Sequence, residues 1–128
     1  MSVREDLRYT KDHEWVGRQG DRFLVGITDF AQKKLGDVIY VELPEVDAAL
    51  IHGQFFGSVE SVKAVAEIYA PCDGTVAQVN GELSDAPELV NDDPYGEGWM
   101  IEVAASDPSF WEHLLSAADY TALVAAES

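Results

Sequence analysis

The chain has 128 residues and a mass of 14.0 kDa, and this length predicts a single domain, residues 1–128. Hydrophobic residues make up 47% of the sequence and charged residues 25%, a composition that indicates a globular protein and excludes a disordered or fibrous one. Lys and Arg number 8 against 24 Asp and Glu, a formal net charge of −16, so nucleic acid and anionic membranes would repel the protein and are not expected partners.

Short β-rich runs separated by turn residues dominate the sequence. In chain order, the expected strands are residues 13–16, 22–27, 38–43, 55–62, 65–69, 75–79 and 99–103. Glycine, proline and aspartate residues stand between several of these runs, as turns require. Strands this short and this evenly spaced predict a mainly β domain of the sandwich or small-barrel type.

Two internal segments interrupt the β pattern. Asp29 is expected to cap a short helix, and Gly36 is expected to end it, because glycine commonly follows the last turn of a helix. Residues 80–98 hold two prolines and three glycines, so they predict a long ordered loop with one helical turn.

The C-terminal segment has helix signals. Asp107 followed by Pro108 predicts the start of a helix, since an acidic cap and a proline in the first turn favour one. Asp119 is expected to cap a final helix. These helices, over about residues 107–126, would cover a β body that spans about residues 7–104.

The sequence lacks the usual patterns for catalysis or metal binding. It has no Gly-rich phosphate loop, no His-Glu-x-x-His zinc motif and no Gly-x-Ser-x-Gly nucleophile turn. The three histidines, His13, His52 and His113, are too scattered to predict a metal site. The single cysteine, Cys72, excludes an intramolecular disulfide, and without an obvious partner base it predicts a half-buried thiol with no catalytic role.

The start of the chain does not resemble a targeting segment, because it contains acidic residues and no apolar run. No run of apolar residues approaches the length of a membrane span. We therefore expect a cytoplasmic protein of bacterial origin, and the absence of paired cysteines agrees with a reducing compartment.

One lysine stands out by its position. Lys63 lies between two runs that predict strands, so it is expected at the tip of a hairpin with its amine in solvent. A lysine at a sheet edge commonly prevents edge-to-edge pairing of strands. Spacing alone favours that structural role over a chemical one.

Several longer motifs follow one another along the chain. They are YTKDHEW at residues 9–15, VGITDFAQ at 25–32, LGDV at 35–38, VELP at 41–44, FGSVESVK at 56–63, AP at 70–71, LVN at 89–91 and DPYGEGW at 93–99. Over residues 7–120 this series resembles the H proteins of the glycine cleavage system, which carry lipoate. The resemblance implies one lipoyl-carrier domain with a lipoyl-domain-like barrel-sandwich hybrid fold. Such a fold has two small antiparallel sheets related by a pseudo-twofold axis, here with a short internal helix and C-terminal helices.

Carried over by position, the resemblance implies that a lipoyl-attaching enzyme links lipoate to Lys63 through an amide. The protein would then be a carrier without stand-alone enzymatic activity. It would shuttle the aminomethyl group of glycine from the pyridoxal-phosphate glycine decarboxylase (P protein) to the tetrahydrofolate-dependent aminomethyltransferase (T protein). Dihydrolipoamide dehydrogenase (L protein) would reoxidise the arm. The alternative is an H-like protein that relays lipoyl or octanoyl groups to other acceptors.

Three acids, Asp12, Glu14 and Glu67, match the positions at which the family holds the loaded arm in a surface cleft. Nearby carboxylates favour the protonated form of an amine, and a protonated amine cannot expel the sulfur and release formaldehyde. Relatives often have serine at position 12 and aspartate at position 67, and sometimes histidine where this chain has Lys34. We therefore rank Glu14 ahead of the other two acids.

Other functions fit the sequence less well. Biotin carriers usually have methionine on both sides of the modified lysine, whereas Val62 and Ala64 flank it here, and lipoyl domains of 2-oxo acid dehydrogenases usually have aspartate before it. A stand-alone enzyme with His13 and Glu14 as an acid–base pair is disfavoured, because neighbours on a strand point to opposite faces. The intact ESVK segment at 60–63 disfavours an interaction module that has lost its modification.

Overall fold

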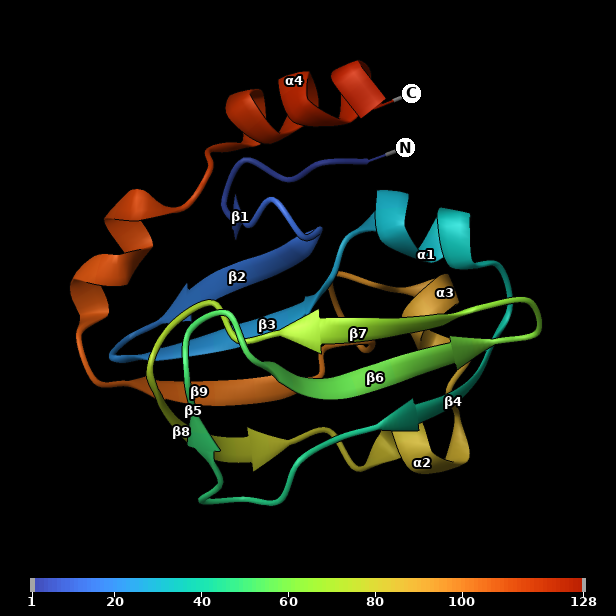
Figure 1. Ribbon diagram of the computed structural model, residues 1–128, viewed down its shortest axis with the longest axis horizontal. Helices are drawn as coiled ribbons and strands as arrows, with labels where there is room; N and C mark the ends of the chain where they lie inside the picture. Colours follow the sequence, from blue (N-terminus) through green and yellow to red (C-terminus); the bar gives the residue numbers. More distant parts are fainter. Residues whose placement is uncertain (1, 128) are drawn as a thin grey trace.

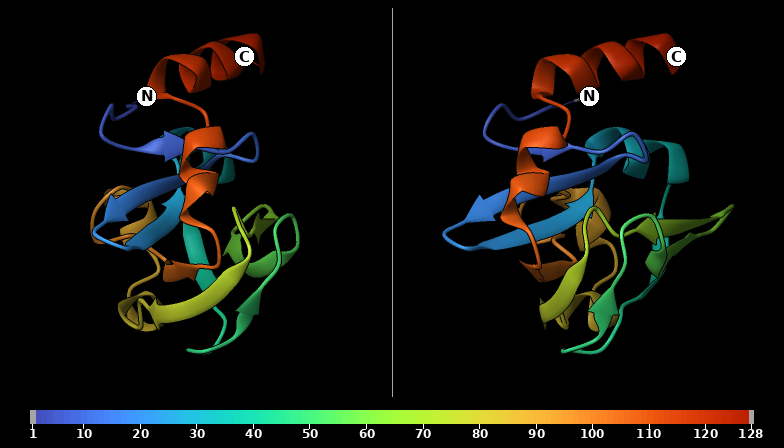
Figure 2. Two further views of the ribbon diagram at one scale, coloured as in Figure 1. Left: turned by 90° about the vertical axis from the view of Figure 1, so that its left-hand side faces the viewer. Right: turned by 60° about the vertical axis from the view of Figure 1, so that its left-hand side comes forward.

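The computed structural model describes residues 2–127, which form nine strands in two antiparallel sheets (Figure 1). The strands are β1 Arg8–Tyr9, β2 Glu14–Gln19, β3 Arg22–Ile27, β4 Val38–Glu42, β5 Ala49–Leu50, β6 Phe55–Ser61, β7 Val65–Tyr69, β8 Gly74–Val79 and β9 Ile101–Ala105. The six-stranded sheet has the order β1-β2-β3-β9-β8-β5, and the three-stranded sheet has the order β4-β6-β7. The sheets pack against each other (Figure 2), which confirms the predicted fold class, although they are unequal in size.

All the predicted strands are present, with some ends shifted. β3 and β7 have the predicted bounds, whereas β2 begins at Glu14 rather than at His13. The backbone of His13 has a φ of +69°, in the left-handed region, and this conformation interrupts a strand. β1 and β5 are not predicted from the sequence, because two residues are too few to show an alternating pattern.

The helices are α1 Asp29–Leu35, α2 Glu82–Asp85, α3 Leu89–Asp92, the 3-10 helix η1 Pro108–His113 and α4 Ala117–Glu127. The predicted cap of α1 is wrong by one residue, because the hydroxyl of Thr28 accepts the N–H of Ala31 and Asp29 is the first helical residue. Gly36 ends α1 as predicted, with a φ of +81° that glycine adopts without strain.

The later helices differ in part from the prediction. Residues 80–98 contain two four-residue helices, α2 and α3, rather than one helical turn. Asp107 caps η1 as predicted by accepting the N–H of Ser109, although η1 is a 3-10 helix. The prediction that Asp119 caps the last helix is wrong, because α4 begins earlier and the hydroxyl of Ser116 accepts the N–H of Asp119.

Apolar side chains of both sheets form the core. Val41 and Val59 of the small sheet pack in one cluster with Ile27 of the large sheet. Cys72 is buried in a neighbouring cluster, and burial raises the pKa of its thiol to about 12. The thiol is therefore protonated at neutral pH and a poor nucleophile, in line with the absence of a catalytic pattern around it.

The C-terminal helix packs over the edge of the large sheet. Tyr120 of α4 stacks on Tyr9 of β1 with ring centroids 4.6 Å apart, and both rings are fully buried. Tyr9 also forms a β-bridge with Leu115, just before α4. Consequently, α4 lies beside the N-terminal segment at the top of the molecule (Figure 1).

Gly57 lies where β6 passes close to the backbone of β4. A Cβ atom at this position would stand 2.4 Å from the carbonyl oxygen of Glu42, and neither strand can move away without disturbing their pairing. We expect Gly57→Ala to lower the free energy of unfolding, measured in urea, by about 2 kcal/mol, a typical cost of overpacking. Gly81→Ala, at a site surrounded by open space, is the control and should change stability by less than about 0.5 kcal/mol. Equal losses would contradict the steric argument.

Candidate functional site

Lys63 lies at the tip of the β6–β7 hairpin, which projects from the body of the domain (Figure 2, right). The buried Ser61 hydroxyl accepts the N–H groups of Lys63 at 3.3 Å and of Ala64 at 3.1 Å. The N–H of Val62 donates to the carbonyl of Asp37, so the tip is also tied to the chain just before β4. Val62, Lys63 and Ala64 are exposed, which leaves the lysine amine accessible on a hydrogen-bonded turn.

The side chain of Lys63 extends toward the C-terminal end of α1. Its Cε lies 3.4 Å from the point at which a Cβ atom on Gly36 would stand. The unpaired carbonyl groups at the end of a helix attract a cation, so this position suits an ammonium group. Lys63 is the only Lys or Arg in residues 35–128 of the sequence.

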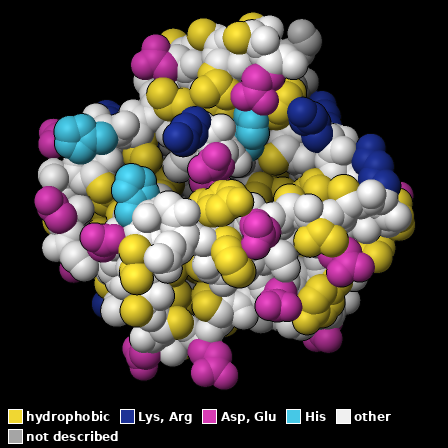
Figure 3. All heavy atoms as spheres, viewed as in Figure 1, with side chains coloured by type: hydrophobic (Ala, Val, Ile, Leu, Met, Phe, Trp, Pro, Cys, Tyr) yellow, Lys and Arg dark blue, Asp and Glu magenta, His cyan; other side chains and the backbone are white. Residues whose placement is uncertain are grey.

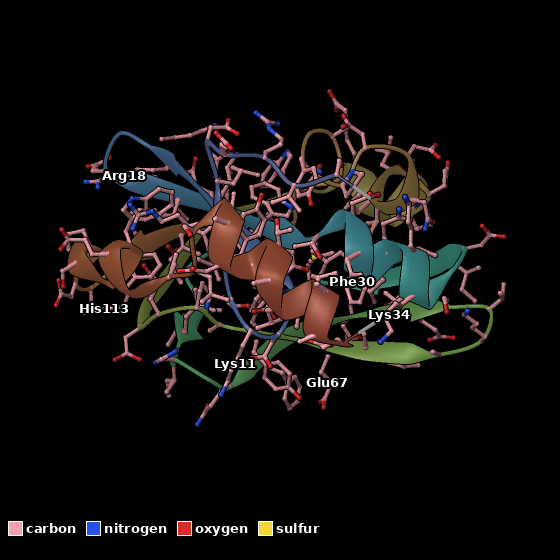
Figure 4. The ribbon with its side chains drawn as sticks, turned by 90° about the horizontal axis from the view of Figure 1, so that it is seen from above. Lys11, Arg18, Phe30, Lys34, Glu67 and His113 are labelled. Carbon is pink, nitrogen blue, oxygen red and sulfur yellow. The ribbon has the colours of Figure 1, made fainter. Side chains whose placement is uncertain are left out.

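A cleft of about 220 Å³ opens between α1, β7 and the turn before β2, and we call it the arm cleft. Its lining residues are Asp12, His13, Ile27, Ala31, Lys34, Leu35, Ala66, Glu67 and Ile68. Hydrophobic side chains gather in the hollow below α4 (Figure 3), and Figure 4 shows Lys34 on α1 and Glu67 on β7 as seen from above. Because Leu35 lines the cleft and Lys63 lies against the next residue, the cleft begins beside the lysine.

Two of the three predicted acids line the arm cleft. Asp12 and Glu67 are exposed there, whereas Glu14 is only 1% exposed and lines an adjoining groove of about 490 Å³. The Glu14 carboxylate accepts the O–H of Thr10 at 2.5 Å and the N–H of Tyr69 at 3.1 Å, and burial raises its pKa to about 7. Asp12 and Glu67 thus line the arm cleft, whereas Glu14, which the sequence analysis ranks first, does not.

His13 also lines the arm cleft, and no pattern in the sequence predicts this position. Its ring contacts α4, which lies more than 100 positions away in the sequence, so only the folded chain brings these groups together. His52 and His113 line a different groove. Within residues 2–127, no group of three or more His, Cys, Asp or Glu side chains is arranged to hold a metal ion.

A lysine on a hairpin tip beside an apolar cleft, on two packed antiparallel sheets, defines a protein of the lipoyl-domain-like carrier class. The sequence model of the family described as glycine cleavage H-protein matches residues 7–127. Among residues 2–127, no helix has the length and apolar character needed to cross a membrane.

Individual relatives agree with this match. The glycine cleavage system H protein of Anaeromyxobacter sp. (strain K) is 57% identical over 124 residues and covers 97% of each chain. That of Geobacillus thermodenitrificans is 51% identical, over 97% of this chain and 98% of its own. The crystal structure of a glycine cleavage system H protein from Mycobacterium marinum superposes with a TM-score of 0.88 at 36% identity, over 96% of this chain and 99% of that one. The chain belongs to the glycine cleavage H-protein family.

The buried carboxyl group of Glu14 makes stability depend on pH. Its pKa is about 7 in the folded protein against 4.5 for the unperturbed group, so the folded state binds this proton more tightly than the unfolded state does. The stabilisation is complete below about pH 4.5 and is lost as the pH rises through 7. We expect the wild type to lose about 3 kcal/mol relative to Glu14→Gln between pH 4.5 and pH 8.

Urea denaturation of both proteins across this pH range measures the effect. Glu60→Gln, which removes an exposed carboxyl group from β6, is the control and should run parallel to the wild type. Parallel curves for the wild type and Glu14→Gln would contradict the raised pKa of Glu14.

Proposed function

We propose that this chain is the lipoyl-bearing carrier of the glycine cleavage system, with lipoate amide-linked to Lys63. The observation that carries the proposal is an exposed lysine on an ordered tip at the start of an apolar cleft. A ligase reaches such an amine without unfolding the domain, and the deprotonated amine attacks an activated acyl group. When attached, lipoate supplies a disulfide at the end of a long arm, which takes up the aminomethyl group of glycine and passes it on.

The residues of the arm cleft fit such an arm. Ile27, Ala31 and Ile68 would contact its hydrocarbon part and exclude water from it. Asp12 and Glu67 would hold the proton on the amine of the carried group, because nearby carboxylates favour the charged form. The chain's own contribution is thus to anchor the arm, to bury it and to keep the carried amine protonated.

We assign partners from the family. They are the glycine decarboxylase (P protein), the aminomethyltransferase (T protein), dihydrolipoamide dehydrogenase (L protein) and a lipoyl-attaching enzyme. A tether raises the local concentration of the carried group at each partner's site, so transfer needs no permanent complex. We propose that the chain has no activity without these partners and that it works in a bacterial cytoplasm, since the relatives named above are bacterial.

Attachment at Lys63 is tested by intact mass. After incubation with lipoate ligase, ATP and lipoate, the wild type should gain one lipoyl group and Lys63→Arg should gain none. Lys34→Arg, which alters an exposed lysine at the cleft, is the matched control and should gain the full increment. An increment on Lys63→Arg, or none on folded and initially unmodified wild type, would overturn the assignment.

The cleft carboxylates should prolong the life of the carried group. In lipoylated protein loaded from glycine by P protein, we expect Asp12→Asn and Glu67→Gln to release formaldehyde and ammonia about 3- to 10-fold faster at pH 7, because loss of a nearby negative charge lowers the pKa of the amine. Glu60→Gln, outside the cleft, should decay like the wild type. Glu14→Ala is measured in parallel, because the family resemblance predicts that this variant also releases formaldehyde and ammonia faster than the wild type. Decay at the wild-type rate in Asp12→Asn and Glu67→Gln would contradict the role of the cleft.

The loading step also separates glycine cleavage from acyl relay. An H-like protein that relays lipoyl or octanoyl groups would be lipoylated on Lys63 as well. Only the glycine cleavage carrier would take up glycine-derived carbon from the decarboxylase. Full lipoylation without such loading would favour the relay.

A further inference from the structure

His13 joins the arm cleft to the C-terminal helix. Its ring lines the cleft, while Nδ1 lies 2.8 Å from the Tyr120 hydroxyl and Nε2 lies 3.1 Å from a carboxylate oxygen of Glu127. The Tyr120 hydroxyl lies 2.7 Å from the hydroxyl of Thr28, which accepts the N–H of Ala31. A continuous series of hydrogen bonds therefore runs from the last turn of α4, through His13, to the first turn of α1.

The donors and acceptors in this series determine where the hydrogens lie. A carboxylate only accepts hydrogen bonds, so Nε2 of His13 carries a hydrogen directed at Glu127. In the neutral ring, Nδ1 then accepts the O–H of Tyr120, whose oxygen accepts the O–H of Thr28. In the protonated ring, Nδ1 donates to Tyr120 instead, and the Tyr120 hydroxyl turns toward Thr28. Both ring nitrogens are engaged in either state, so a group in the cleft would have to displace Tyr120 or Glu127 to reach one of them.

We propose that α4 prevents His13 from acting as a base in the arm cleft, with Tyr120 and Glu127 as positioning residues that engage both ring nitrogens. This inference rests on the proposed carrier function. A free imidazole nitrogen at the wall would accept a proton from the ammonium of the carried aminomethyl group. The electron pair of the neutral amine would then break the carbon–sulfur bond, with sulfur leaving as thiolate. Water would convert the released methylene-iminium ion to formaldehyde and ammonium.

Charged side chains from three segments surround His13 in the cleft. Asp12 from the turn and Glu67 from β7 line the same cleft, and Lys34 from α1 is the one Lys or Arg in its lining. The ring also packs against Phe30, with ring centroids 4.9 Å apart, a contact that does not depend on α4.

The first test uses the unmodified protein. Glu127→Ala removes the acceptor of Nε2 at the exposed end of α4. Nitrogen-15 NMR of the His13 ring should show the Nε2–H form in the wild type and a mixture of tautomers in Glu127→Ala. Glu127→Gln retains an oxygen acceptor and should resemble the wild type, as should Asp119→Ala, which removes one acid from the same helix. An unchanged ring spectrum in Glu127→Ala would overturn the inference.

The second test follows the carried group in lipoylated, glycine-loaded protein. We expect Glu127→Ala to lose it about tenfold faster than the wild type near pH 7. Glu127→Gln and Asp119→Ala should decay like the wild type. The double variant His13→Asn/Glu127→Ala should decay like His13→Asn alone, since asparagine tolerates the left-handed backbone and removes the imidazole.

These outcomes distinguish the two proposals. Equal decay in Glu127→Ala and the wild type, or full acceleration in the double variant, would overturn the inference about His13 and leave the carrier function intact. Absence of lipoylation or of loading in the wild type would overturn the carrier function and this inference with it.

Discussion

The buried carboxyl group of Glu14 links β2 of the large sheet to β7 of the small one, beside the arm cleft. Taking a carboxyl group out of water costs free energy unless hydrogen bonds replace those of the solvent. Here the O–H of Thr10 and the N–H of Tyr69 supply them, one to each oxygen. The turn after Thr10 carries Asp12, and β7 carries Glu67, so the same contact links the two segments that carry the acids of the cleft.

Much of the fold could be predicted because local patterns determine it. Alternation of apolar and polar residues predicts the bounds of β3 and β7, whose side chains meet different environments on their two faces. The cap of α1 could not be predicted, because Thr28 and Asp29 are both suitable residues. The choice depends on Tyr120 of α4, which binds the Thr28 hydroxyl from a distant part of the sequence and holds it at the start of the helix.

The site was only partly accessible from the sequence. The strand pattern alone places Lys63 at a hairpin tip, whereas the expectation that it carries lipoate comes from resemblance to a family. The burial of Glu14 has no local signal, since an acid beside Trp15 at the start of a strand is as often exposed. The contacts of His13 with Tyr120 and Glu127 span 107 and 114 residues, and no periodicity in the sequence records them.

The separation of formal charges along the chain gives the molecule an electric dipole. Seven of the 8 Lys and Arg residues lie within the first 34 residues, and five of these seven lie in β1, β2, β3 and α1. Acylation of Lys63, the eighth basic residue, would remove its positive charge and change the formal net charge of the protein from −16 to −17. Such a field orients an oppositely charged partner surface before the two proteins make contact. Because salt screens the field beyond about 8 Å, the orientation of each encounter depends on ionic strength.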